Sequence, residues 1–216
     1  SFPVVAQGHL CRLACRGVCQ TADVVANLAD LVSVAAAARP RHPAVVTESR
    51  VTTWSEVEWQ VRAVASGLVA RGLPPGSRVG ILQRNTLEFV TSYFGILRAG
   101  MVAVPLNTGY TAAELGLMMA DVDAALILAD PQVRNAVQEL EVDIVYTGTE
   151  DWRRFTVGSS PLPTEPTDPE SLAVLMFTSG TSGRPKAAML THRALNANLE
   201  QLSALSDPPG MTADDV

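Results

Sequence analysis

Several residue types and patterns are scarce in this 216-residue sequence, and each scarcity argues against a class of protein. Only one of the 16 cationic side chains is a lysine, and the net charge is −6. This charge argues against a nucleic acid or an anionic membrane surface as the main partner. No apolar run reaches the roughly 18 residues that a membrane-spanning helix needs. Charged residues make up 18% and hydrophobic residues 47%, which predicts a globular chain rather than a disordered one.

Cysteine is confined to the N-terminal region, at Cys11, Cys15 and Cys19. Three sulfurs with His9 as the nearest histidine fit a zinc site poorly, so small apolar packing residues are the favoured interpretation and metal binding the alternative. An odd count, with none in the rest of the chain, indicates a reducing compartment. Arg12 and Arg16 interrupt any apolar stretch that could act as a signal peptide. We therefore expect a cytoplasmic protein, with peripheral membrane contact left open.

The middle of the sequence alternates between strand-like and helix-like patterns. Short apolar segments typical of strands occur at residues 78–82, 101–105, 124–128 and 143–146. Thr53-Trp54-Ser55-Glu56 and Thr111-Ala112-Ala113-Glu114 carry the capping-box pattern that begins a helix. Gly72 and Gly100 lie where two of these helices are expected to end. The alternation predicts βαβ crossovers and an α/β fold with mostly parallel sheets covered by helices on both faces.

The pattern divides the chain into four parts. Residues 1–20 are an extension of unknown role, 21–156 an N-terminal α/β subdomain, 157–170 a proline-rich connector, and 171–216 the start of a second α/β segment. Further expected elements are a helix from Asp23 to just before Pro40, a strand pair over 44–46 and 50–52, a helix opened by Asn85, a helix begun by Pro131, and a last helix ended by Pro208.

An apolar run over residues 172–177, typical of a buried strand, breaks into nine residues that are mainly hydroxyls, glycines and one lysine. Glycines let the backbone turn its N–H groups to one side, which forms a concave site for an anion. Hydroxyls add donors that rotate toward phosphate oxygens, and a lysine adds a compact positive charge. The pattern predicts a phosphate-binding loop made by Thr178, Ser179, Gly180, Thr181, Ser182, Gly183 and Lys186.

An ordinary flexible hairpin is the competing interpretation, because Gly, Ser and Thr are common loop residues. Lys186 argues against it, since the only lysine of the chain falls within this nine-residue window, with chance odds of roughly 4%. The loop is not a Walker A motif, and the sequence contains no G-x-G-x-x-G pattern. A P-loop phosphotransferase is therefore disfavoured.

Residues 178–186 resemble the AMP-binding signature of the adenylate-forming superfamily, which includes acyl-CoA synthetases, luciferases and nonribosomal adenylation domains. One departure is Ala187, where the family most often has glycine. Other segments are similar, in order and spacing, to acyl-CoA synthetase N-terminal regions: 53–57, 76–79, 85–89, 98–100, 104–107 and 110–111. The resemblance covers about residues 21–216, and it looks closer to fatty-acyl or medium-chain CoA ligases than to peptide-synthetase adenylation domains.

The resemblance implies attack of a carboxylate, here a fatty acid, on the α-phosphate of ATP, then thioester formation with coenzyme A. It implies that the loop binds the ATP phosphates, while Mg²⁺ bridges phosphate oxygens and no protein metal ligand is assigned. Arg184 has no defined place in the family motif. The family's remaining catalytic residues would follow Val216, so no catalytic residue set is complete here. We expect this polypeptide not to complete adenylation by itself.

Several alternatives stay open. The chain could be a truncated, non-catalytic module that binds a nucleotide or a partner, and a fatty acyl-AMP ligase or an adenylation domain is less favoured. His192 begins the helix after the loop, where packing is favoured over a catalytic role because no carboxylate partner can be named. The remaining acidic candidates are interpreted as solvated helix ends and turns: Asp121, Asp123, Glu139 and Glu141.

Overall fold

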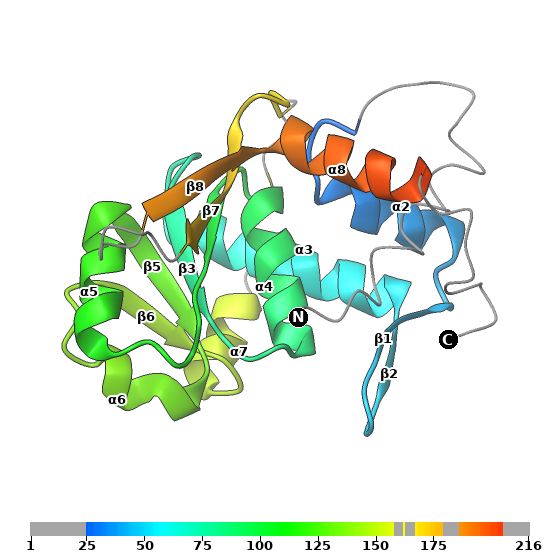
Figure 1. Cartoon of the computed structure of the whole chain (residues 1–216). Coiled ribbons are helices and arrows are strands. Elements are labelled where there is room, and N and C mark those ends of the chain that lie inside the picture. Colours follow the sequence, from blue (N-terminus) through cyan, green and yellow to red (C-terminus); the bar gives the residue numbers. More distant parts are fainter. Residues whose placement is uncertain (1–24, 158–161, 163–166, 179–185, 205–216) are drawn as a thin grey trace.

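The structure is a computed structural model that describes residues 25–157, 162, 167–178 and 186–204 (Figure 1). Its centre is a six-stranded sheet. In order across the sheet, the strands are β6 (Asp143–Tyr146), β5 (Ala124–Ala129), β3 (Arg78–Leu82), β4 (Val102–Pro105), β7 (Leu172–Thr178) and β8 (Lys186–Thr191). Neighbouring strands from β6 to β7 are parallel, and β8 returns antiparallel to β7.

Helices cover both faces of this sheet (Figure 1). On one face lie α3 (Trp54–Ala70), α4 (Leu87–Arg98) and α7 (Glu150–Thr156), and on the other lie α5 (Ala112–Asp121), the 3₁₀ turn η2 (Pro131–Val133) and α6 (Arg134–Val137). The remaining elements are α2 (Asp30–Ala38), which packs on α3, the antiparallel hairpin of β1 (Pro43–Val46) and β2 (Val51–Thr53), and α8 (His192–Ala204) after β8. The predicted α/β fold is confirmed.

The central strands are buried on both faces because their residues alternate between two apolar clusters. Val79 and Ile81 of β3 pack with α3 and α4, whereas Leu82 packs with α5. The same alternation places Leu126 and Ile127 of β5 in opposite clusters. This explains why the strands read as continuous apolar runs, as expected for a parallel sheet covered on both sides.

Both predicted capping boxes are present. The Thr53 side chain accepts the Glu56 N–H at the start of α3, and the Thr111 side chain accepts the Glu114 N–H at the start of α5. Each glutamate accepts the threonine N–H in return, and this backbone hydrogen bond is the main reason that the pKa of Glu56 and Glu114 is lowered. A glycine in a left-handed conformation follows two of the helices, as expected: Gly72 (φ 72°) after α3 and Gly100 (φ 72°) after α4.

Two expectations about helix starts were wrong, and one helix was missed. The helix expected from Asp23 begins only at Asp30, because the Asn27 side chain accepts the Ala29 N–H and holds the preceding residues in a non-helical turn. Asn85 does not cap α4, whose N-cap is Thr86; the chain leaving β3 is held by a hydrogen bond from the Arg84 N–H to Asp130. Helix α7 was not expected, although the Thr149 side chain caps it by accepting the Trp152 N–H.

The sheet continues through the segment that was expected to begin a second part of the chain. β7 pairs with β4 and β8 pairs with β7, so both strands extend the sheet formed by β3 to β6. The boundary at residue 171 stays a prediction, as does the extension at 1–20, which lies outside the described residues together with the three cysteines.

Candidate phosphate-binding site

The carboxyl ends of the parallel strands meet at one edge of the sheet, and polar residues follow them. Gln83 comes after β3, Asn107 and Thr108 come after β4, and Thr178 is the last residue of β7. In open α/β sheets, ligands bind outside the carboxyl ends of the strands. This edge is therefore where the fold would place a ligand.

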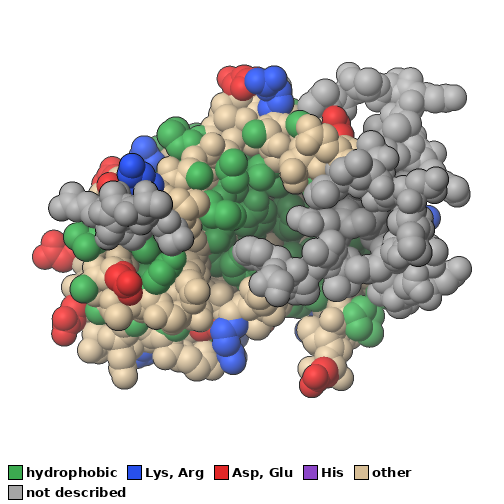
Figure 2. All heavy atoms as spheres, in the orientation of Figure 1, with side chains coloured by type: hydrophobic (Ala, Val, Ile, Leu, Met, Phe, Trp, Pro, Cys, Tyr) green, Lys and Arg blue, Asp and Glu red, His purple; other side chains and the backbone are tan. Residues whose placement is uncertain are grey.

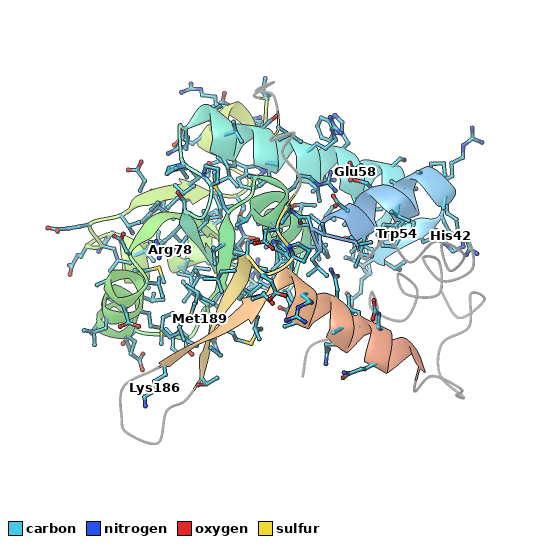
Figure 3. The ribbon with its side chains drawn as sticks, turned by 90° about the horizontal axis from the view of Figure 1, so that it is seen from above. His42, Trp54, Glu58, Arg78, Lys186 and Met189 are labelled. Atoms are coloured by element: carbon cyan, nitrogen blue, oxygen red, sulfur yellow. The ribbon has the colours of Figure 1, made fainter. Side chains whose placement is uncertain are left out.

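The β7–β8 hairpin carries the ends of the predicted phosphate loop. Thr178 and Lys186 face each other in the last ladder pair, and the Thr178 hydroxyl donates to the Lys186 carbonyl oxygen at 3.3 Å. Both residues are exposed, and Figure 3 shows Lys186 at the end of β8 that is distant from α8. The structure thus brings together Thr178 and Lys186 at the mouth of the loop. The other predicted site residues lie outside the described residues, as does Arg184: Ser179, Gly180, Thr181, Ser182 and Gly183.

A cleft of about 530 Å³ opens beside the end of β7. Its apolar lining comes from α4, the β4–α5 connection and β7: Phe89, Pro105, Leu106, Tyr110, Met176 and Phe177. Its polar lining comes from the ends of β3 and β4: Gln83, Arg84, Asn85, Asn107 and Thr108. A molecule with an apolar body and a polar end would match this lining.

The apolar surface continues from the cleft along α4. Phe89 and Tyr93 stack with ring centroids 6.5 Å apart, and Tyr93 meets Phe94 edge-on at 5.3 Å. Burial raises the pKa of Tyr93 to about 12, so its hydroxyl stays neutral at physiological pH. Figure 2 shows hydrophobic side chains gathered in a hollow of this face, over α4 and below α8.

A buried carboxylate lies at the carboxyl edge of the sheet, beside the ends of β3 and β5. Asp130, 5% exposed, accepts hydrogen bonds from the Arg84 N–H at 3.0 Å, the Arg84 Nε at 3.2 Å and the Thr147 hydroxyl at 3.1 Å. The Arg84 side chain remains 63% exposed and is part of the cleft lining, so its ion pair with Asp130 places a cation at the cleft. Sequence reasoning missed this pair, although a cation two residues after one apolar strand and a carboxylate directly after another were a usable signal.

Within the described residues, the buried face of Gln83 is incompletely paired. Its Nε2 donates to the Ser92 hydroxyl at 3.2 Å, while its Oε1 is buried without a hydrogen-bond partner. An unpaired buried acceptor is costly, and such groups cluster at functional sites. Gln83 therefore marks the inner wall of the cleft as polar, despite its position directly after a hydrophobic strand.

His192 lies at the opposite end of the hairpin from Lys186. It is 2% exposed, and its Nδ1 accepts the Leu28 N–H at 3.1 Å. Burial lowers the pKa of His192, an effect partly opposed by the nearby Asp30 carboxylate. The side chain is thus a packed hydrogen-bond acceptor, in agreement with the favoured interpretation. The four acidic residues interpreted as solvated are all exposed: Asp121, Asp123, Glu139 and Glu141.

Two further features bear on the class of site. Among the described residues, no group of three His, Cys, Asp or Glu side chains is arranged to hold a metal ion. In the same part of the chain, every helix is too short or too polar to cross a membrane.

Comparison with known proteins identifies the family. The AMP-binding enzyme family matches residues 32–216. The chain is 31% identical over 158 residues to gramicidin S synthase 2 of Aneurinibacillus migulanus, a match that covers 72% of this chain and 3% of that protein. It is 29% identical over 184 residues to the fatty acid–[acyl-carrier-protein] ligase ScoC of Streptomyces coeruleorubidus, a match that covers 82% of this chain and 35% of that protein.

A solved structure supports the fold. The N-terminal domain of FACL13 from Mycobacterium tuberculosis superposes with a TM-score of 0.76 at 24% identity, over 84% of this chain and 48% of that one. The α/β fold of this chain thus matches that of a known N-terminal domain. The chain spans about a third of ScoC and half of the FACL13 domain, and it belongs to the AMP-binding enzyme family as an N-terminal portion of an adenylate-forming enzyme.

Proposed function

We propose that this chain supplies the ATP-phosphate-binding loop of a ligase. The ligase activates a fatty acid as its adenylate and transfers the acyl group to coenzyme A. The observation that carries the proposal is the mouth of the hairpin, where Thr178 and Lys186 are paired and exposed at the carboxyl edge of the sheet. The loop between them has the residue types that bind phosphates, and family membership implies the use of ATP.

The proposed chemistry joins two anions, a carboxylate and a triphosphate. Lys186, the hydroxyls of Thr178, Ser179, Thr181 and Ser182, and the N–H groups of the two glycines would neutralise the β- and γ-phosphates and the departing pyrophosphate. Preorganised donors of this kind each contribute on the order of 10²–10³ in rate in enzymes. We assign Mg²⁺ to the phosphate oxygens and retained waters rather than to a protein cage.

The cleft beside β7 is assigned to a co-substrate that must lie next to ATP. Its apolar floor and its polar rim, with the Arg84 cation held by Asp130, suit an amphipathic molecule such as a fatty acid or the thiol that accepts it. The fatty-acid assignment is supported by the similarity to ScoC over 82% of the chain.

Activation of an amino acid is the second candidate. The similarity to gramicidin S synthase 2, at 31% identity, favours it. An acid-dependent ATP–pyrophosphate exchange screen on the full-length gene product, with octanoate, palmitate, benzoate and the amino acids, separates the two candidates. Exchange with fatty acids alone supports the proposal, and exchange with an amino acid alone overturns it. We expect no carboxylate-dependent pyrophosphate release from the 216-residue chain by itself.

The affinity for MgATP tests the proposed phosphate-binding role of Lys186 directly. Removing a charged hydrogen-bond donor costs about 2 kcal/mol, so Lys186→Ala should weaken MgATP binding about 30-fold by calorimetry. Lys186→Arg keeps the charge but changes its shape, and should restore binding in part. Arg193→Ala is the matched control, because it removes another exposed cation at the base of the same hairpin. Equal loss in the Lys186 and Arg193 variants would contradict a specific role for Lys186.

A further inference from the structure

The segment before α2 is tied by hydrogen bonds to elements that are distant in sequence. This segment, residues 25–29, is here named the strap. The Asn196 side chain donates to the Val25 carbonyl at 2.6 Å, and the Leu28 N–H donates to His192 Nδ1 at 3.1 Å. Asn196 and His192 both lie in the first turns of α8. The strap is therefore attached to α8 at two points.

The opposite side of the strap is attached to the end of α4. Asn27 Nδ2 donates to the Leu97 carbonyl at 2.8 Å, and Arg98 Nη2 donates to the Ala29 carbonyl at 2.6 Å. Leu28 and Ala29 are also buried in the apolar cluster that includes β3 and β4. The strap thus connects α8 to the best-buried part of the molecule.

The hairpin shares fewer backbone pairs with the parallel strands than those strands share with one another. β3 shares four ladder pairs with β4 and five with β5, whereas β7 shares only one pair with β4, Ala103 with Val174. β8 pairs with β7 alone among the described strands. From Leu175 onward, the hairpin therefore projects beyond its last backbone bond to the parallel strands.

The base of the hairpin is anchored where α8 begins. The His192 N–H donates to the Ser171 carbonyl at 3.3 Å, and the Arg193 N–H donates to the Pro169 carbonyl at 2.8 Å. These bonds join the first residues after β8 to the residues before β7. Any tilt of α8 against α4 would consequently tilt the hairpin, whose far end lies about 20 Å away, six residues at ~3.3 Å each.

We propose that His192 and Asn196 are positioning residues for the phosphate site: by binding the strap, they fix the direction in which the hairpin presents Thr178 and Lys186. The proposal rests on the phosphate-binding function proposed above. Neither side chain contacts the site, and both act through α8 and the base of the hairpin. His192 must be an acceptor at Nδ1 for this purpose, because the Leu28 N–H that it meets can only donate.

The test uses two variants that differ in this one acceptor. His192→Ala removes the acceptor, whereas His192→Asn places Oδ1 in the position of Nδ1 and retains it. Backbone hydrogen exchange without nucleotide is measured for residues 187–190 of β8 and, as an internal reference, for 79–82 of β3. MgATP affinity is then measured for the same proteins. Asn196→Ala, which frees the Val25 carbonyl, is a second variant in case His192→Ala does not fold.

We expect exchange in β8 to become at least tenfold faster in His192→Ala and Asn196→Ala, with β3 unchanged and His192→Asn close to the wild type. MgATP affinity should fall about tenfold in the same two variants and recover in His192→Asn. Unchanged β8 exchange in both alanine variants, or a His192→Asn variant as defective as His192→Ala, overturns the proposal. A merely structural role would accelerate exchange in β3 and β8 alike, which also overturns it. If the wild type fails to bind MgATP, the proposed function fails, and the exchange data still decide the role of the strap.

Discussion

The two ends of the sheet differ in how deeply their side chains are buried. From β6 to β4, each strand is covered by helices on both faces, and the apolar side chains of the central strands β3 and β5 are at most 1% exposed where they enter the two clusters. At the other end, β7 and β8 form a hairpin in which Met176 and Met189 are 36% and 70% exposed. The hairpin nevertheless carries Thr178 and Lys186, the two ends of the proposed phosphate loop.

This difference indicates that the buried parallel strands support the fold, whereas the exposed hairpin can present groups to a ligand. Parallel strands buried on both faces gain stability from packing, but they leave no room for a ligand within their length. A strand pair at the margin can leave its donors exposed, provided that something else holds its base. Here the strap and the first turn of α8 hold it.

The largest expected effect comes from Asp130, within the buried part. Asp130→Ala leaves the Arg84 N–H without its acceptor and the Thr147 hydroxyl with only the longer bond to the Ala129 carbonyl, so we expect a loss of about 3 kcal/mol in the free energy of unfolding. Arg84→Ala removes only the exposed half of the pair and should cost less than about 1 kcal/mol. Urea unfolding of both variants checks this, and similar losses would contradict the larger contribution expected from the buried acceptor.

The contact between α3 and α4 should give the next effect. A Cβ at Gly95 would lie 2.6 Å from Val64 Cγ1, so Gly95→Ala should destabilise the protein by about 2 kcal/mol through overpacking. Gly116 in α5 is the matched control, because its Cβ would meet only Leu140 at 3.4 Å, an ordinary contact. Gly116→Ala should be neutral or slightly stabilising by thermal unfolding, since alanine favours helix. Equal destabilisation by both changes would refute the close packing of α3 on α4.

Acidification should destabilise the protein at His192, which lies where the hairpin joins the rest of the molecule. The pKa of His192 is lowered by burial, so the folded state binds this proton less well than the unfolded state. Neutral His192 therefore contributes to the free energy of unfolding. This contribution is fully present above the unfolded pKa, near 6.5, and is lost as the pH falls below it. Between pH 7.5 and 5.5, the wild type should therefore lose more stability than His192→Asn, measured by urea unfolding. Identical pH dependence in the two proteins would show that His192 does not need to be neutral.

The smallest effect is expected on the hairpin surface. Leu175 and Met189 are cross-strand partners, yet Leu175 is 6% exposed and Met189 is 70% exposed. Met189→Ala should change the free energy of unfolding by less than about 0.5 kcal/mol, whereas Leu175→Ala should cost about 3 kcal/mol. A large loss for Met189→Ala would mean that this face of β8 is covered in solution.

Local signals predicted much of the fold. The capping boxes at Thr53 and Thr111, and the glycines that end α3 and α4, act within one turn of the chain, so their patterns were sufficient. The strands were visible because both faces are buried. The start of α2 was misplaced because Asn27 and Leu28 are held by α4 and α8, contacts that span 70 and 164 residues.

The candidate site was likewise predicted only in part from the sequence. Lys186 and the hydroxyl residues of the loop stood out by composition alone. The Arg84–Asp130 pair and the His192–Leu28 bond did not, because each joins residues that only the folded sheet brings together. The sequence therefore predicted residues for phosphate binding, but not the distant contacts that hold the elements on which they lie.

The reactivity of the Lys186 amine tests the central claim most directly. Since Lys186 is the only lysine, an amine-acylating reagent labels it and the N-terminal amine alone, and mass spectrometry separates the two. If the loop grips the β- and γ-phosphates, saturating MgATP should slow labelling of Lys186 at least tenfold, while AMP should have little effect and the N-terminal amine should be unchanged. Equal labelling of Lys186 with and without MgATP would contradict the account.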